Sequence, residues 1–160
     1  MEFGPAAFFA CHIAGNVIAS SVRLVMDTDV VVAALRSPGG ASAALLAAAR
    51  AGKVRLLASV PLAFEYESVC LRPEHQAASG LTRAEVGVFL DALIALADPV
   101  ACWFLWRPQL RDAGDEMALE AAVNGQADAL TTFNRRDFLP AANNFGVKVL
   151  LPRDVLEILI

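Results

Sequence analysis

Short apolar runs alternate along the chain with stretches whose apolar residues recur at helical spacing. Such runs are typical of buried strands. The alternating pattern begins at Val22, and each apolar run is followed by a turn or cap signal. The runs predict five strands, at residues 22–26, 54–58, 100–106, 127–131 and 147–151.

Helix signals fill the gaps between these runs. Pro61 suits the first turn of a helix that runs towards Leu71, before Arg72 and Pro73 interrupt it. Further helices are predicted after the 37–40 turn to about residue 51, after the capping box at 82–85, over 112–124 with a stop at 125, and from residue 152 onward. Strands separated by helices predict a three-layer α/β/α sandwich around a mainly parallel sheet of about five strands.

The first 21 residues differ from the rest. Residues 3–22 contain no Lys, Arg, Asp or Glu and are rich in Ala, Phe, Ile and Val. We interpret residues 1–21 as an apolar extension of a domain that spans 22–160. An extra packed element and an upstream choice of start codon both remain open for this segment.

Composition limits the classes of function. The chain has 160 residues, of which 57% are hydrophobic and 19% charged, and its net charge is −4. No run of about 20 residues has the composition of a membrane span, and the three cysteines show no CxxC pair, so we expect a cytoplasmic protein without disulfides, zinc or membrane contact. The acidic balance argues against a large basic face for non-specific nucleic-acid binding, but a small phosphate site remains open.

Five polar residues lie where predicted strands end or where the following helices begin: Asp27, Glu65, Asp115, Asn134 and Asp137. Parallel strands bring their carboxyl ends to one edge of a sheet, which is where α/β proteins bind ligands. Several carboxylates in one cleft repel each other unless a cation lies between them. Their hard oxygen ligands suit Mg²⁺ or Mn²⁺, which can bind a phosphate and activate a water molecule.

Most of these residues also fit a structural role. Asp112 and Asp115 have the spacing of a helix cap and a first-turn charge, and the polar pair after the fourth strand is spaced similarly. Glu67 competes with Glu65, and either could be solvated. Asp29 could cap a short helix that follows it.

Four segments resemble blocks of PIN-domain ribonucleases. Residues 24–30 (LVMDTDV) resemble the opening strand of that family, and residues 34–40 (ALRSPGG) resemble its bacterial branch of toxins from toxin–antitoxin pairs. Residues 111–116 (RDAGDE) and 127–138 (ADALTTFNRRDF) resemble the third and last acidic blocks of the branch. The resemblance extends from about residue 22 to residue 160.

This resemblance implies a metal-dependent endoribonuclease that prefers single-stranded RNA and uses Mg²⁺ or Mn²⁺. The family acids fall on Asp27, Glu65 and Asp115, and the fourth position is Asn134, with Asp137 close behind. Supporting roles would fall to Thr28, Asp29, Asp112, Glu116 and Thr132, and contacts to the RNA backbone to Arg111, Arg135 and Arg136. The implied partners are the RNA, a cognate antitoxin protein and a second copy of the chain.

Two departures from the family pattern change the local charge in opposite directions. Asp29 replaces a usual Asn, and Asn134 replaces a frequent Asp. The alternative is therefore a degenerate domain that binds protein or RNA without cutting. A phosphotransfer receiver domain fits less well, because the predicted third strand contains no Asp and Lys148 lies within the fifth. The aromatic residues Phe64, Tyr66, Trp103, Phe104 and Trp106 would form either a partner surface or part of the core.

Overall fold

A parallel sheet forms the centre of the structure, a computed structural model that describes residues 21–160. Within these residues the sheet has five strands in the order β3-β2-β1-β4-β5, and every neighbouring pair is parallel. The strands are β1 (Val22–Met26), β2 (Val54–Ser59), β3 (Ala97–Val100), β4 (Ala129–Thr131) and β5 (Lys148–Leu150). The predicted parallel sheet is confirmed.

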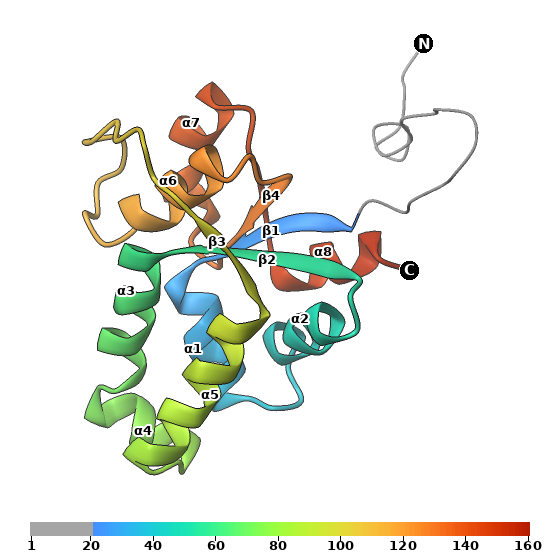
Figure 1. Ribbon diagram of the computed structural model, residues 1–160, viewed down its shortest axis with the longest axis vertical. Coiled ribbons are helices and arrows are strands. Elements are labelled where there is room, and N and C mark those ends of the chain that lie inside the picture. Colours follow the sequence, from blue (N-terminus) through green and yellow to red (C-terminus); the bar gives the residue numbers. More distant parts are fainter. Residues whose placement is uncertain (1–20) are drawn as a thin grey trace.

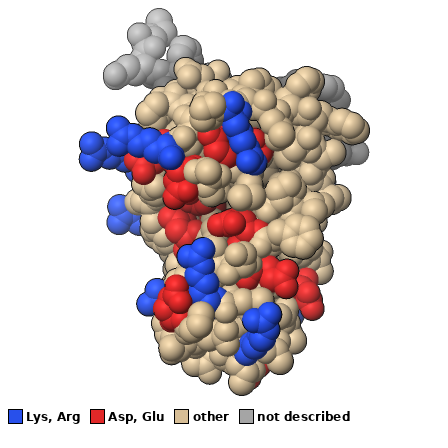
Figure 2. Space-filling view, turned by 90° about the vertical axis from the view of Figure 1, so that its left-hand side faces the viewer, with Lys and Arg blue, Asp and Glu red and all other residues tan. Residues whose placement is uncertain are grey.

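Helices cover both faces of this sheet, as Figure 1 shows. They are α1 (Thr28–Arg36), α2 (Ala41–Arg50), α3 (Val60–Cys70), α4 (Pro73–Ser79), α5 (Arg83–Leu96), α6 (Glu116–Asn124), α7 (Arg135–Asn144) and α8 (Pro152–Ile158). Helices α6 and α7 lie on one side, and α1, α2, α5 and α8 lie on the other. The predicted three-layer α/β/α sandwich is therefore confirmed. Figure 2 views the molecule from the side on which β1 and β2 end.

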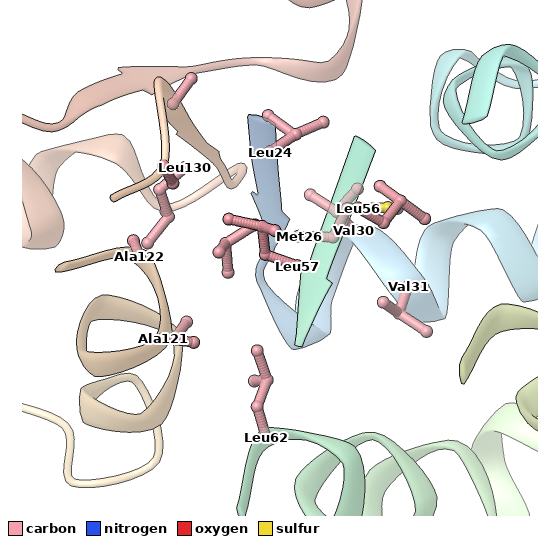
Figure 3. Packing of buried hydrophobic residues seen from close by; sticks show 14 of the residues in the cluster. Leu24, Met26, Val30, Val31, Leu56, Leu57, Leu62, Ala121, Ala122 and Leu130 are labelled. Atoms are coloured by element: carbon pink, nitrogen blue, oxygen red, sulfur yellow. The ribbon is translucent and has the colours of Figure 1, made fainter. Parts of the chain in front are cut away.

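The core is densest around β1, the middle strand. Leu24 and Val25 are fully buried, because helices cover both faces of this strand, and this explains its uninterrupted apolar sequence. Figure 3 shows Met26 close to Leu57 of β2, with α6 on one side and α1 on the other. The valines at the start of α1 are weak helix formers, yet Val30 and Val31 are completely buried, so packing rather than propensity stabilises this helix.

The prediction of the third strand was wrong. The strand is Ala97–Val100, whereas residues 101–106 form a loop with exposed aromatic side chains. Pro99 argues against a strand in the sequence, because proline lacks a backbone N–H. However, β3 lies at the edge of the sheet, where this missing N–H is tolerated. Asp98 also forms an ion pair across the strands with Arg55, at 2.6 Å.

Other boundaries differ by a few residues. The helix predicted from Asp112 begins at Glu116, because residues 110–115 form turns instead. Strands β4 and β5 are each shorter than predicted. Cys70 and Cys102 are free thiols. The predicted extension at residues 1–21 lies outside the described residues, apart from Ser21.

In residues 21–160, no single helix combines the length and the apolar character needed to cross a membrane. Helices α1 and α2 meet this criterion only as a pair, and they are bent by 97° at the break between them.

Gly125 ends α6 for a reason of space. Its φ of −79° is ordinary, so the left-handed conformation typical of helix-ending glycines is not needed here. A Cβ at this position would lie 2.7 Å from the Ala121 carbonyl oxygen and 2.9 Å from Val100 Cγ2. The absence of a side chain lets the end of α6 pack closely on β2 and β3.

We expect Gly125→Ala to lower the free energy of unfolding by about 1–3 kcal/mol, because the added methyl group overlaps backbone that cannot yield easily. The matched control is Gly87→Ala in α5, where a Cβ would meet nothing within 4 Å. That control should raise stability by up to about 1 kcal/mol, through helix propensity. Urea unfolding measures both, and equal stability of Gly125→Ala and the wild type would contradict the packing argument.

Candidate active site

The pairing of β1 with β4 places the first acidic residue. Met26 is paired with Thr131, so the next residues, Asp27 and Thr132, leave the two strands side by side. The chain builds β2 and β3 on one side of β1, and β4 and β5 on the other. The junction of β1 and β4 is therefore the topological switch point, the usual ligand site of an open parallel sheet.

Asp27 is buried, with only 4% of its surface exposed. One carboxylate oxygen accepts a hydrogen bond from the Thr28 backbone N–H at 2.8 Å, which makes Asp27 the N-cap of α1. The other oxygen accepts from the Thr132 hydroxyl at 2.7 Å. The cap that sequence reasoning assigned to Asp29 thus belongs to Asp27, because the helix begins at Thr28.

Asp29 instead ties α1 to the segment after β4. Its Oδ2 accepts from the Phe133 N–H at 2.9 Å and lies 3.2 Å from the Thr132 hydroxyl. Its Oδ1 is buried and has no hydrogen-bond partner. An unpartnered carboxylate oxygen is costly in a protein interior, so this atom is available to a ligand.

Asn134 connects two further acids. Its amide Nδ2 lies 2.9 Å from Asp137 Oδ2 and 3.5 Å from Asp115 Oδ2. Its backbone N–H donates to the Thr132 hydroxyl at 2.9 Å. Predicted residues from the end of β4 and the start of α6 therefore meet at this point.

These acids form an acidic cluster that is short of positive charge, and its members are Asp27, Asp29, Asp112, Asp115 and Asp137. Burial first, then repulsion from Asp29 and Asp115, raises the pKa of Asp27 to about 7. Burial, followed by the charges of Asp112, Asp29 and Asp137, raises the pKa of Asp115 to about 6. The pKa of Asp29 is also raised, mainly by burial. Figure 2 shows the acidic side chains gathered across the middle of this face, with Lys and Arg side chains around them.

The structure distinguishes the two glutamates of α3. Glu65 Oε1 lies 3.6 Å from the position that a Cβ on Gly114 would occupy, in the loop that carries Asp112 and Asp115. Glu67 lines a groove between α3 and α5 instead. Glu65 is thus the one directed towards the acidic segment.

Other predicted residues lie outside the cluster. Glu116 is buried and accepts hydrogen bonds from the backbone N–H groups of Gln109 and Leu110. Arg135 is 3.8 Å from Asp154, while Arg111 and Arg136 are exposed. Thr28 contributes its backbone N–H to Asp27, as described above.

Sequence reasoning missed a polar ladder on α6, formed by Glu116, Glu120 and Asn124. All three bind the loop at residues 101–110, and the contacts of Glu116 are those just described. Glu120 forms a two-point ion pair with Arg107, at 2.6 and 2.9 Å. The Asn124 side chain forms hydrogen bonds with the backbone at residues 103 and 104. The signal that could have revealed the ladder is the spacing of four residues between its members, which places them on one face of a helix.

Of the aromatic residues that could form a partner surface or part of the core, Tyr66 belongs to the core. It is buried, and its hydroxyl donates a hydrogen bond to the Met26 carbonyl oxygen at the end of β1. Burial, with a contribution from the Asp27 charge, raises the pKa of this phenol well above its usual value. Tyr66 therefore supports the strand end from which Asp27 emerges.

The donor set has the chemistry of a hard cation site, in its carboxylate and amide oxygens and in the unpartnered oxygen of Asp29. The raised pKa values of three of its members are those of carboxylates that lack a compensating cation. Among residues 21–160, however, no three His, Cys, Asp or Glu side chains form a group that could hold a metal ion.

A family model described as a PIN domain matches residues 23–136, well over half of the sequence. The chain belongs to the PIN-domain family. The match covers β1 to the start of α7 and includes Asp27, Glu65, Asp115 and Asn134, but ends one residue before Asp137. PIN domains are generally nucleases that act on nucleic acids with divalent metal ions. The sequence matches no curated protein.

The raised pKa of Asp27 makes the metal-free PIN domain less stable as pH rises. The folded state holds this proton up to about pH 7, whereas the unfolded chain loses it near pH 4. Stability should therefore fall between these values, by about 3 kcal/mol. Asp27→Asn preserves a capping side chain, cannot ionise, and should lose less stability over this range.

Urea unfolding in a chelating buffer at pH 4.5 and pH 8 measures this difference. Asp91→Asn, at an exposed acid on α5, serves as the control and should follow the wild type. Parallel pH profiles for the wild type and Asp27→Asn would contradict the assignment.

Proposed function

We propose that this PIN domain is a metal-dependent endoribonuclease that cleaves single-stranded RNA and acts as the toxin of a toxin–antitoxin pair in the cytoplasm. The observation that carries the proposal is the acidic cluster at the switch point, where Asp27, Asp29 and Asp115 have raised pKa values and Asp29 Oδ1 has no partner. Mutually repelling carboxylates at a ligand site favour a cation, and a cation attracts phosphate.

The residues would divide the work as follows. Asp27, Glu65, Asp115 and Asp137 would hold Mg²⁺ or Mn²⁺, which supplies charge for a phosphate oxygen and lowers the pKa of the attacking water. Thr132, fully buried, fixes the orientation of the Asp27 carboxylate through its hydroxyl.

Asn134 would orient the attacking water, since its side chain lies between Asp115 and Asp137 and carries no charge of its own. Arg111 and Arg136, both exposed, would attract the RNA backbone towards the acids. The proposed protein partners are an antitoxin and a second copy of the chain.

A second candidate is a PIN domain that binds RNA or protein without cutting. Two observations favour it. Asn134 stands where the family often has a carboxylate, and no three acids of the described residues already form a group able to hold a metal ion. Metal binding and cleavage distinguish the two functions.

Cleavage of a labelled single-stranded RNA, measured with Mg²⁺ or Mn²⁺ and with chelator, tests the nuclease. We expect Asp27→Asn and Glu65→Gln to lower the rate by at least about 100-fold, since each removes a charged ligand of the proposed metal. Glu67→Gln is the matched control on the same helix, and it should retain activity because its side chain lines a different groove. Wild-type protein without metal-dependent cleavage would leave the binding module as the function.

Metal binding has an independent readout in thermal stability. Mn²⁺ at pH 7.5 should raise the melting temperature of the wild type, because an ion that binds only the folded state stabilises it by mass action. Asp27→Asn should show a much smaller shift at the same concentration. A shift of equal size in both proteins would place the ion elsewhere.

A further inference from the structure

The loop at residues 101–111, which we name the aromatic loop, exposes large apolar rings near the end of α6 that lies away from the candidate active site. The Trp103 side chain is 83% exposed, and Phe104 and Leu105 are also mostly exposed. Exposing such large apolar side chains to water is unfavourable, so their exposure calls for an explanation, such as a binding partner.

Weak attachment does not explain the exposure. The three residues of the polar ladder bind the aromatic loop at three successive turns of α6. The ladder glutamates, Glu116 and Glu120, are almost completely buried. Burying two carboxylates is costly unless each is hydrogen-bonded, and here Glu120 binds Arg107 while Glu116 binds two backbone N–H groups of the loop. The protein thus holds the rings in a fixed position at the surface.

The rings also support one another. Phe104 and Trp106 are stacked, with ring centroids 5.6 Å apart and planes inclined by 30°. Trp106 also packs against Phe145, and the centroids of these two rings are 5.1 Å apart. This packing stiffens the segment that follows Trp103, while the ring of Trp103 itself is exposed and can stack on a flat partner. Nucleobases are flat partners of this kind.

Charge and position favour RNA as that partner. The aromatic loop contains no acid, and its Arg111 is exposed, whereas the charge of Arg107 is paired with Glu120. It runs back along α6 from Asn124 to Asp112 and Asp115 in the acidic cluster. Nine helical residues span roughly 14 Å, which corresponds to about four stacked nucleotides at ~3.4 Å each.

We infer that the aromatic loop is a base-stacking platform that holds single-stranded RNA about four nucleotides from the site of cleavage. The inference rests on the proposed function for its substrate class. It adds that Trp103 binds the bases rather than the phosphates, which makes the enzyme dependent on unpaired bases.

The chain offers a direct reporter, because both of its tryptophans, Trp103 and Trp106, lie in this loop. We expect a short single-stranded RNA, added in chelator so that nothing is cut, to quench tryptophan fluorescence in a saturable manner. A duplex of the same sequence and an abasic strand of the same length should quench weakly, because neither presents unpaired bases.

Trp103→Ala should raise the Kd for single-stranded RNA about tenfold, as loss of one stacking contact does, while Trp103→Phe should preserve most of the affinity. Val88→Ala is the control, since Val88 is 69% exposed on α5 and belongs to neither site. These variants keep all acids of the cluster, so their RNA affinity in chelator is independent of cleavage.

Three outcomes would overturn the inference: equal quenching by the abasic strand, unchanged RNA affinity in Trp103→Ala, or a shift of Trp103→Ala from dimer to monomer in sedimentation with RNA affinity intact. The last result would assign the aromatic loop to an interface between copies. Quenching without any cleavage in Mg²⁺ or Mn²⁺ would support the platform and refute the nuclease, whereas cleavage with no change in KM for Trp103→Ala would do the reverse.

Discussion

Burial of the Asp27 carboxylate is the constraint on which the site depends. Parallel pairing of β1 with β4 forces Asp27 and Thr132 into contact, and the apolar core beneath them removes water from the carboxylate. A buried charge must be hydrogen-bonded, and here the donors are the first turn of α1 and the Thr132 hydroxyl. The Thr132 hydroxyl in turn accepts a hydrogen bond from the Asn134 N–H. The side chain that donates to Asp27 therefore also fixes the start of the segment that carries Asn134 and Asp137.

The two departures from the family pattern act on each other through this arrangement. Asp29 adds a carboxylate whose charge raises the pKa of both Asp27 and Asp115. Asn134 removes one, and its amide donates towards Asp115, which lowers the pKa of that acid in opposition to burial. The neutral side chain is thus a donor within a group of acceptors. This offsets part of the repulsion that a carboxylate at position 134 would add to a cluster already carrying Asp29.

The sequence was informative wherever one local rule decides the structure. A buried apolar run followed by an acid correctly placed Asp27 at the end of β1, because central parallel strands are apolar on both faces. Edge strand β3 escaped the same rule, since Pro99 and Asp98 are acceptable only where one side of a strand is open. The role of Glu116 was also beyond local reasoning, because its partners are backbone groups in a loop whose path no pattern predicts.

Helix α6 connects the acidic cluster, the polar ladder and the aromatic loop. Asp115 precedes its first residue, the polar ladder runs along one side, and Gly125 closes its far end against β2 and β3. The close approach at Gly125 fixes the height of the helix on the sheet, and the ladder then fixes the aromatic loop on the helix. The distance between Trp103 and the acidic cluster is therefore set by the backbone of one short, well-packed helix, not by the loop itself. A long exposed loop can in this way keep a constant separation from the site without a core of its own.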